Sequence, residues 1–259
     1  MDYNTLLLTK NDCYKSSRRM TPKGIVVHST GVNNTSLSRY IGPDDGRLGA
    51  NRYGNHWNQS GISKCVHAFI GKDKNGKVCT YRTLPLNICC WGVGSGTKGS
   101  YNYDPAYLQF EILEDNLKSK SYFNTVMKEA QELCAKWCKD HNLSVNKIVS
   151  HSEAHKAGYG SNHSDCDHWL SKFGKDMDWF RSEVRKILNN TINVGDKIKI
   201  KSNVTTYYDG KKMASWVKNA TLYVRKKETR DGVSVYLIST NKVLPIYTGR
   251  VKANDVVKV

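Results

Sequence analysis

Short apolar runs and two amphipathic stretches dominate the first 190 residues of the chain. Runs of strand length, either continuously apolar or alternating, occupy residues 24–29, 65–70, 77–81, 106–113 and 147–150. Residues 124–142 and 177–188 have helical spacing, and in the first of these Val126, Ala130, Leu133 and Trp137 share one face. The pattern predicts an α/β fold, a mixed sheet with helices packed on its faces.

The pattern changes after Asn190. Short alternating runs at residues 197–200, 222–224 and 233–238 are separated by turn signals such as Asp209-Gly210, and no helical stretch is expected among them. The sequence therefore predicts two domains, residues 1–190 and residues 191–259, of which the second is a small all-β barrel.

The charge divides at the same point. The 259 residues carry a formal net charge of +17, and residues 191–259, with 14 basic and 5 acidic side chains, contribute +9 of it. A basic module of this kind is suited to a polyanion such as nucleic acid, anionic lipid or wall teichoic acid. No segment approaches the roughly 20 apolar residues of a membrane-spanning helix. The first ten residues lack the basic and apolar regions of a secretory signal, so we expect synthesis in a cytoplasm.

Eight cysteines are present, and none has the paired CxxC spacing of a structural zinc ribbon. Cys134 and Cys138 lie one helical turn apart in an apolar pattern, which is typical of buried thiols. Without a secretory signal, we expect nearly all eight to be reduced and structural.

Ionisable residues end or interrupt several predicted strands. His28 ends the first strand, Glu111 lies inside an apolar strand, and His151 follows the strand after the long helix. Residues 151–169 contain four His and two Asp. Imidazole and carboxylate groups are good zinc ligands, and a catalytic site needs three of them and an open position. The alternative from the residues alone is a set of ordinary hydrogen-bonded histidines and a solvated loop.

Four segments, in this order, carry a resemblance: Ile25–Thr30, Cys65–Gly71, Leu108–Ile112 and Ile148–Glu153. They resemble the type 2 N-acetylmuramoyl-L-alanine amidases, zinc enzymes that share a fold with peptidoglycan recognition proteins. Residues 90–103 and 161–165 are closest to clostridial phage and prophage endolysins. The resemblance spans about residues 20–185, and the segment from Val194 to Val251 is similar to their bacterial SH3-like wall-binding domains.

The resemblance implies three ligands for Zn²⁺: His28, His151 and Asp165. Cys166 is the main alternative to Asp165, and three further neighbours could substitute: His155, Asp167 and His168.

The resemblance also assigns roles around the metal. Glu111 matches the catalytic carboxylate, and an uncompensated Glu in an apolar strand would carry a large desolvation cost. His163 takes the position of a Lys that assists the reaction in relatives. His67 and Trp91 match positions at the substrate cleft, where His67 is expected to contact substrate, to pack or to take part in catalysis. Gly92 stands where many relatives have a His after this Trp, so any contribution of that His must be absent or supplied differently.

The function implied is zinc-dependent hydrolysis of the amide bond between N-acetylmuramic acid and L-alanine. We expect an endolysin that lyses Gram-positive walls after release through a holin pore, with its C-terminal domain on an anionic or glycan wall polymer. Nucleic acid and membrane insertion are not expected. The alternatives are a host autolysin, a muropeptide-recycling amidase, a non-catalytic peptidoglycan-binding protein and a nucleic-acid binder. A full ligand set argues against the binding protein, and the tail argues against recycling of soluble fragments.

Overall fold

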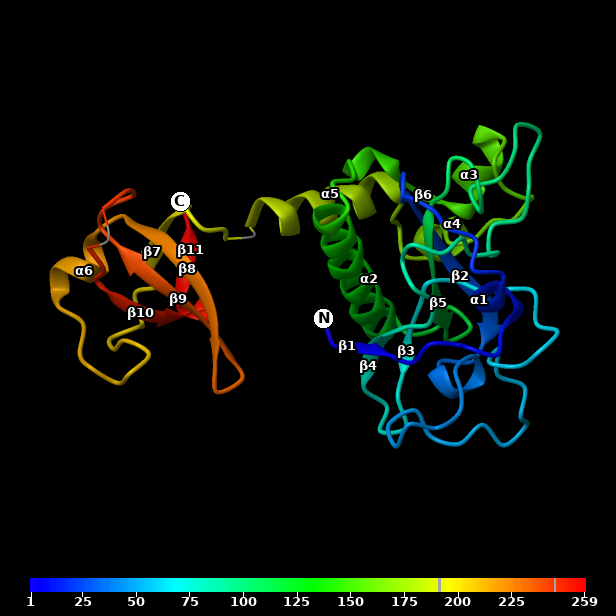
Figure 1. Cartoon of the computed structure of the whole chain (residues 1–259), viewed down its shortest axis with the longest axis horizontal. Coiled ribbons are helices and arrows are strands. Elements are labelled where there is room, and N and C mark those ends of the chain that lie inside the picture. The colour runs from blue at the N-terminus through cyan, green and yellow to red at the C-terminus, as the bar shows by residue number, and fades with distance from the viewer. Residues whose placement is uncertain (191, 245) are drawn as a thin grey trace. The chain divides into compact units, whose positions relative to one another are not determined.

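The computed structural model describes residues 1–190, 192–244 and 246–259. The chain forms two compact units, Met1–Leu188 and Asn189–Val259 (Figure 1). Within the described residues, no helix is both long and apolar enough to cross a membrane.

A six-stranded mixed sheet forms the centre of the first unit, with the strand order β1-β4-β3-β5-β2-β6. Its strands are β1 (Tyr3–Thr5), β2 (Ile25–Asn33), β3 (Ala68–Lys72), β4 (Val78–Arg82), β5 (Leu108–Glu114) and β6 (Ile148–Ser150). Strands β3 and β4 pair antiparallel, as the predicted hairpin requires, and all other neighbours in the sheet are parallel. The predicted α/β class is confirmed, and only the short edge strand β1 has no counterpart in the prediction.

The helices of this unit are α1 (Asp12–Ser16), α2 (Lys120–Asp140), α3 (His151–Ala157), α4 (Asp167–Lys172) and α5 (Met177–Asn190), with 3₁₀ turns at Leu37–Arg39 and Val145–Lys147. Helix α2 begins before the predicted Asn124, because the Ser119 hydroxyl accepts the backbone N–H of Tyr122 and caps the first turn. Helix α3 was not predicted, although Ser150 and Glu153 form a capping box at its start.

The two faces of the sheet have different partners. Alternate side chains, among them Val27 and Phe110, join the buried face of α2 in one core, which also contains residues of α4 and α5. The intervening side chains, including His28, Gln109 and Glu111, therefore lie on the opposite face. The alternation of β2 and β5 thus brings the ionisable strand residues together on the face away from α2.

Two cysteines depart from the expectation of reduced thiols. Cys13 in α1 and Cys65, just ahead of β3, form a disulfide. The other six cysteines are free and buried. Cys13 and Cys65 are 52 residues apart, so no local spacing pattern identifies them as a pair.

The second unit contains one antiparallel sheet with the order β10-β9-β8-β7-β11. Its strands are β7 (Lys197–Ile200), β8 (Leu222–Arg230), β9 (Val233–Ser239), β10 (Gly249–Lys252) and β11 (Val256–Lys258). The expectation that no helix follows Asn190 is wrong, because α6 (Ser215–Asn219) and a 3₁₀ turn (Ala253–Asp255) are present. Helix α6 buries Val217 but is too short to produce a helical periodicity in the sequence.

Candidate active site

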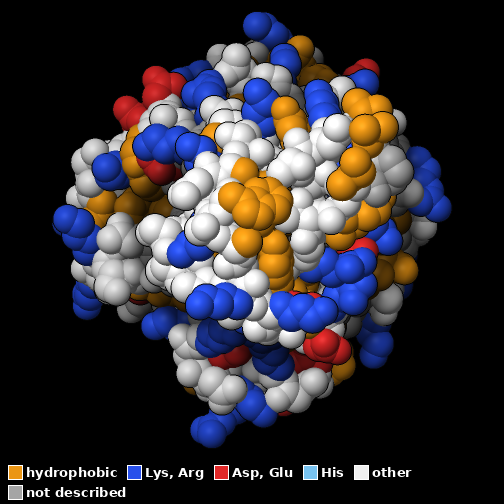
Figure 2. Space-filling model, turned by 90° about the vertical axis from the view of Figure 1, so that its left-hand side faces the viewer, with side chains coloured by type: hydrophobic (Ala, Val, Ile, Leu, Met, Phe, Trp, Pro, Cys, Tyr) orange, Lys and Arg blue, Asp and Glu red, His pale blue; other side chains and the backbone are white. Residues whose placement is uncertain are grey.

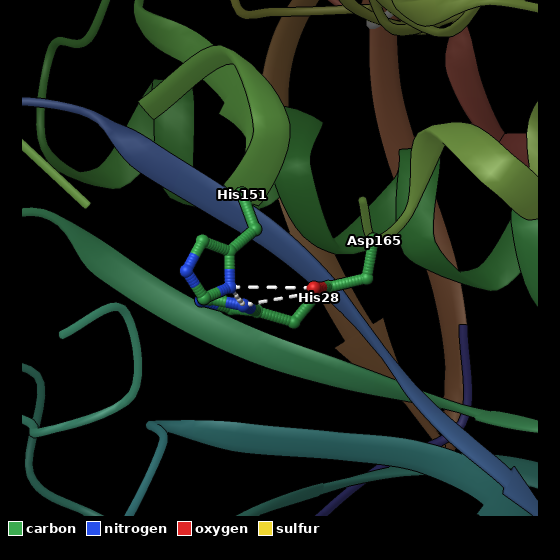
Figure 3. Close-up of side chains that lie close together, drawn as sticks. All are labelled: His28, His151 and Asp165. Carbon is green, nitrogen blue, oxygen red and sulfur yellow. Dashed lines mark hydrogen bonds and ion pairs between the residues drawn. The ribbon is translucent and has the colours of Figure 1, made fainter. Parts of the chain in front are cut away.

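Three side chains from different elements converge beside the sheet: His28 from β2, His151 from the start of α3, and Asp165 from the loop before α4 (Figure 3). The Nδ1 atom of His28 lies 3.1 Å from Nδ1 of His151 and 3.1 Å from Oδ2 of Asp165. Nδ1 of His151 lies 3.4 Å from the other carboxylate oxygen of Asp165. Both imidazoles therefore direct the same nitrogen at one carboxylate.

The position of His151 follows from the start of α3. Strand β6 ends at Ser150, whose hydroxyl accepts the backbone N–H of Glu153. The Glu153 carboxylate returns to the Ser150 N–H and also pairs with Arg181 of α5, at 2.9 Å. Arg181 further donates to the carbonyl of Ile148 in β6. The first residue of α3 is thus held against both the sheet and α5.

A chain of hydrogen bonds fixes the proton of His28. The backbone N–H groups of Gly92 and Val93 both point at Oδ1 of Asn102, each at 3.2 Å, so that oxygen must be an acceptor. The Gln109 side chain then donates its Nε2–H to the same oxygen, at 2.9 Å. This orientation leaves Oε1 of Gln109 to accept from Nε2 of His28, at 3.1 Å. His28 consequently carries its proton on Nε2 and offers a lone pair on Nδ1.

His151 has a similar arrangement. Its Nε2 lies 3.2 Å from Oγ of Ser161, which leaves Nδ1 for the cluster. Burial alone would raise the pKa of Asp165, but the adjacent imidazoles of His151 and His28 outweigh it and hold that pKa well below its usual range. Two neutral imidazole nitrogens and one ionised carboxylate form a donor set that suits Zn²⁺. The three residues therefore fit the metal that the sequence suggests.

The alternatives to Asp165 are engaged elsewhere. The Cys166 side chain is fully buried in the core, with its Sγ 3.9 Å from Sδ of Met177. The remaining candidates have partners of their own, since Asp167 accepts from Ser150, His155 bonds the carbonyl of Gly160, and His168 bonds Glu114. Among the described residues, Asp165 is the carboxylate that joins the two histidines.

Glu111 lies directly beside His28 in the sheet, because the two residues are paired in register between β5 and β2. It lines a cleft of about 170 Å³ together with Thr30, Val32, Arg39, Tyr40, Trp57 and Lys64. Its Oε2 is buried and has no hydrogen-bond partner within the described residues. Burial raises the pKa of Glu111 well above its usual range, and the nearby charges of Asp165 and Glu114 add to this. An unpartnered carboxyl at the floor of a cleft is suited to proton transfer.

His163 lies at the rim of the cluster. Its side chain is exposed, its ring centroid is 4.6 Å from that of His151, and its Nδ1 is 3.0 Å from Oγ of Ser161. An imidazole in this position can donate a hydrogen bond to a group bound beside His151.

His67 and Trp91 are not at the surface of this cleft. His67 is fully buried, where Nδ1 accepts the backbone N–H of Gln109 and Nε2–H donates to the carbonyl of Ile88. The predicted substrate contact does not fit this burial, and His67 instead supports the strand that carries Gln109. Trp91 is half-buried and packs against a group of buried residues that includes Cys65 and Cys90. None of its contacts within this group is with His28 or His151.

The surroundings of Gly92 explain why this position carries no side chain, whereas many relatives have a His there. A Cβ atom on Gly92 would lie 2.5 Å from Oε1 of Gln109, so the Gln109 amide occupies the space of any side chain there. Gln109 and Asn102 were not predicted as site residues from the sequence. A signal for Gln109 was available, since this polar residue lies two positions before Glu111 in an apolar strand and therefore on the same face.

The fold and the cluster together define an α/β protein with the donor set of a mononuclear metal site. The family model described as N-acetylmuramoyl-L-alanine amidase matches residues 18–167, more than half of the chain. The chain therefore belongs to the N-acetylmuramoyl-L-alanine amidase family.

Solved structures agree with this fold. The solution structure of the PlyG catalytic domain superimposes with a TM-score of 0.51 at 16% identity, covering 73% of this chain and 96% of that one. A structure of a PlyL mutant gives a TM-score of 0.50 at 15% identity, covering 71% of this chain and 99% of that one. At this identity the likeness concerns the fold. No curated protein matches the sequence significantly.

Proposed function

We propose that the chain is a zinc-dependent N-acetylmuramoyl-L-alanine amidase, which hydrolyses the amide bond between N-acetylmuramic acid and L-alanine of peptidoglycan. The observation that carries this proposal is the cluster of His28, His151 and Asp165 next to an unpartnered Glu111, in a member of this family. Zn²⁺ held by the three side chains would polarise the scissile carbonyl and activate a water molecule.

The residues of the chain supply the proton transfers. Glu111 lines the cleft beside His28, where its carboxylate takes a proton from the attacking water and returns it to the leaving amine. A divalent cation at the neighbouring cluster favours the ionised form of Glu111, which opposes the effect of burial on its pKa. His163, exposed beside His151, donates a hydrogen bond to the oxygen that becomes negative in the transition state.

We further propose that the second unit, an SH3-like module, holds the enzyme on the wall of a Gram-positive cell. Residues 191–259 carry more than half of the net charge, and they contain none of the cluster residues. Figure 2 shows a face on which Lys and Arg side chains are widespread and acidic side chains are few. Such a surface attracts an anionic polymer over a range set by the ionic strength.

This combination favours an endolysin of the phage or prophage type, resembling those of clostridia. In this proposal the chain is made in the cytoplasm of the bacterial host and reaches the wall after holin-type release. A host autolysin with the same chemistry is the alternative, and the timing of release during phage induction distinguishes the two.

The decisive experiment is digestion of purified Gram-positive walls with and without a chelator, followed by analysis of the products. We expect new L-alanine amino termini without new reducing sugar ends, and loss of activity with chelator that zinc restores. Walls that bind the protein but release no amino termini would indicate a peptidoglycan-binding protein instead. Affinity for DNA without affinity for walls would indicate a nucleic-acid binder.

A further inference from the structure

A pocket lies within the second unit, which contains none of the cluster residues His28, His151 and Asp165. It has a volume of about 380 Å³ and is lined by Tyr207, Tyr208, Asp209, Lys211, Arg230, Thr248, Gly249 and Arg250. The lining combines aromatic rings with guanidinium groups, and the proposed amidase chemistry uses none of these residues.

Two arginines of the pocket are held side by side by one carboxylate. Nε of Arg230 and Nε of Arg250 donate to the same oxygen, Oε2 of Glu228, at 2.8 and 3.0 Å. Hydrogen bonds from Arg250 and Arg230 lower the pKa of Glu228 to about 2, so the carboxylate stays ionised at neutral pH. Neither guanidinium makes another side-chain hydrogen bond among the described residues, which leaves the terminal amino groups of both available.

This geometry is suited to binding an anion. The Nε of each arginine is used for positioning, and the terminal amino groups of two neighbouring guanidinium groups can bind the oxygens of one phosphate or carboxylate. The two arginines carry one positive charge more than Glu228 neutralises. Lys226 also pairs with Glu228, at 3.3 Å, and adds a further positive charge nearby.

The aromatic wall of the pocket is fixed in place. The backbone N–H of Tyr208 donates to the carbonyl of Arg250 at 2.8 Å, and its hydroxyl donates to Asp231 at 2.8 Å. A Cβ on Gly249 would lie 2.5 Å from the ring of Tyr207, so this ring lies directly against the backbone of β10. A rigid aromatic wall beside an anion site is suited to a sugar or polyol unit that bears the anion.

We infer that this pocket binds an anionic unit of a cell-wall glycopolymer, with Arg230 and Arg250 on its phosphate or carboxylate and Tyr207 and Tyr208 against its sugar or polyol. The inference rests on the proposed wall-binding role of the second unit and identifies the residues that carry it out. The phosphodiester of a teichoic acid and the carboxylate of an acidic sugar offer the same chemistry to the two arginines.

The test measures binding of the full chain to purified Gram-positive walls by sedimentation, at 4 °C with a chelator so that the walls remain intact. Arg250→Gln should weaken binding by about tenfold or more, the value for loss of a charge-assisted hydrogen bond. Arg250→Lys, which keeps the charge but not the fork, should also bind more weakly than the wild type. Lys201→Gln, an exposed lysine outside the pocket, removes the same charge and should change affinity less than about threefold.

Chemical treatment of the walls distinguishes the two sources of the anion. Extraction with hydrofluoric acid removes phosphodiester-linked polymers, and amidation with a carbodiimide neutralises carboxylates. Whichever treatment abolishes binding should also abolish the difference between wild type and Arg250→Gln. Equal affinities of Arg250→Gln and Lys201→Gln would overturn the inference and leave a general charge effect.

The same samples separate this inference from the proposed function. Amidase activity on soluble muropeptides should be unchanged in Arg250→Gln, since the pocket lies outside the first unit. A wild-type chain that does not bind walls would contradict the wall-binding role itself. Absence of amidase products from muropeptides would contradict the proposed chemistry, whatever the second unit binds.

Discussion

Oε1 of Gln109 lies 3.1 Å from Nε2 of His28, and the side-chain amide of Gln109 is itself oriented by its hydrogen bond to Asn102. Backbone N–H groups can only donate, so the two that point at Asn102 fix its Oδ1 as an acceptor. The orientation of the Gln109 amide and the position of the His28 proton follow from this. The lone pair that His28 offers to a metal is thus set by the backbone at Gly92 and Val93.

Replacement of Gln109 by Ala should weaken zinc binding without removing a ligand. The His28 ring would lose its only acceptor on Nε2 among the described residues and could then take the other tautomer or turn away. Loss of such a partner typically lowers metal affinity by about 10–100-fold. Competition with a chromophoric chelator measures the affinity directly. Asn102→Ala should produce a smaller loss in the same direction, and unchanged zinc affinity in both variants would contradict the role of this network.

Replacement of Gly92 by Ala should also weaken zinc binding, because it displaces the side-chain amide of Gln109. The new Cβ would lie 2.5 Å from Oε1 of Gln109 and 3.0 Å from Cγ1 of Val66, so the amide must shift. We expect zinc affinity to fall by about tenfold although no hydrogen-bonding side chain is lost. The double variant with Gln109→Ala is the control, because a shared mechanism predicts a loss smaller than the sum of the two single losses.

The parts of the site that could be predicted are those that depend on local patterns. The continuous apolar run of β2 and the alternation of β5 were sufficient to place His28 and Glu111 on strands, and the resemblance to known amidases then assigned their roles. The contacts of Gln109 with Asn102 join residues on a strand and in a loop, and no periodicity connects them. The sequence left both packing and substrate contact open for His67, because it gives no signal of the carbonyl that satisfies a buried imidazole.

The features of the second unit that could not be predicted were missed for a similar reason. Strands β7, β8 and β9 were predictable from alternation and turn signals, whereas the short strands β10 and β11 were not predicted. A one-turn helix such as α6 has no repeating face. The pairing of Arg230 and Arg250 through Glu228 depends on the order of β8, β9 and β10 in the sheet, which the sequence pattern does not specify.

Asp165 and Cys166 should respond differently to substitution, although they are adjacent. Asp165→Ala removes a carboxylate that contacts both histidines and should reduce bound zinc well below one per chain. Cys166→Ala should retain stoichiometric zinc and cost about 1 kcal/mol of stability, because the thiol is buried in the core next to Met177. Metal analysis of the dialysed proteins checks both. Zinc lost from Cys166→Ala but retained by Asp165→Ala would reverse the assignment.

Glu111→Gln should separate metal binding from turnover. The amide has nearly the same shape, and Glu111 is not one of the three proposed ligands, so zinc content should remain at the wild-type value. Without a group that accepts a proton, the rate of muropeptide hydrolysis should fall by about 10²–10⁴-fold. Zinc content and product release are measured on the same preparation, so loss of metal cannot be mistaken for loss of the base. Near wild-type hydrolysis would remove Glu111 from the mechanism.

His67 should make the first unit less stable as the pH falls below neutral. Burial lowers the pKa of this imidazole from 6.5 to about 4, although the hydrogen bond from its Nε2–H to the carbonyl of Ile88 acts in the opposite direction. Between these values the unfolded chain binds a proton that the folded chain does not. The stabilisation is therefore complete above about pH 6.5, declines as the pH falls toward 4, and levels off below that. The full loss from this one group is about 3 kcal/mol, at 1.36 kcal/mol per pKa unit.

Urea unfolding at a series of pH values between 7.5 and 4, in the presence of a chelator, measures this dependence. Other groups also titrate in this range, so the informative quantity is the difference between wild type and His67→Gln. The variant retains a side-chain N–H that can donate to the carbonyl of Ile88 but has no group that protonates near neutral pH. It should be less stable than the wild type at pH 7.5, and the gap should narrow steadily as the pH falls. A gap that stays constant down to pH 4 would mean that His67 is protonated as readily in the folded chain as in the unfolded one.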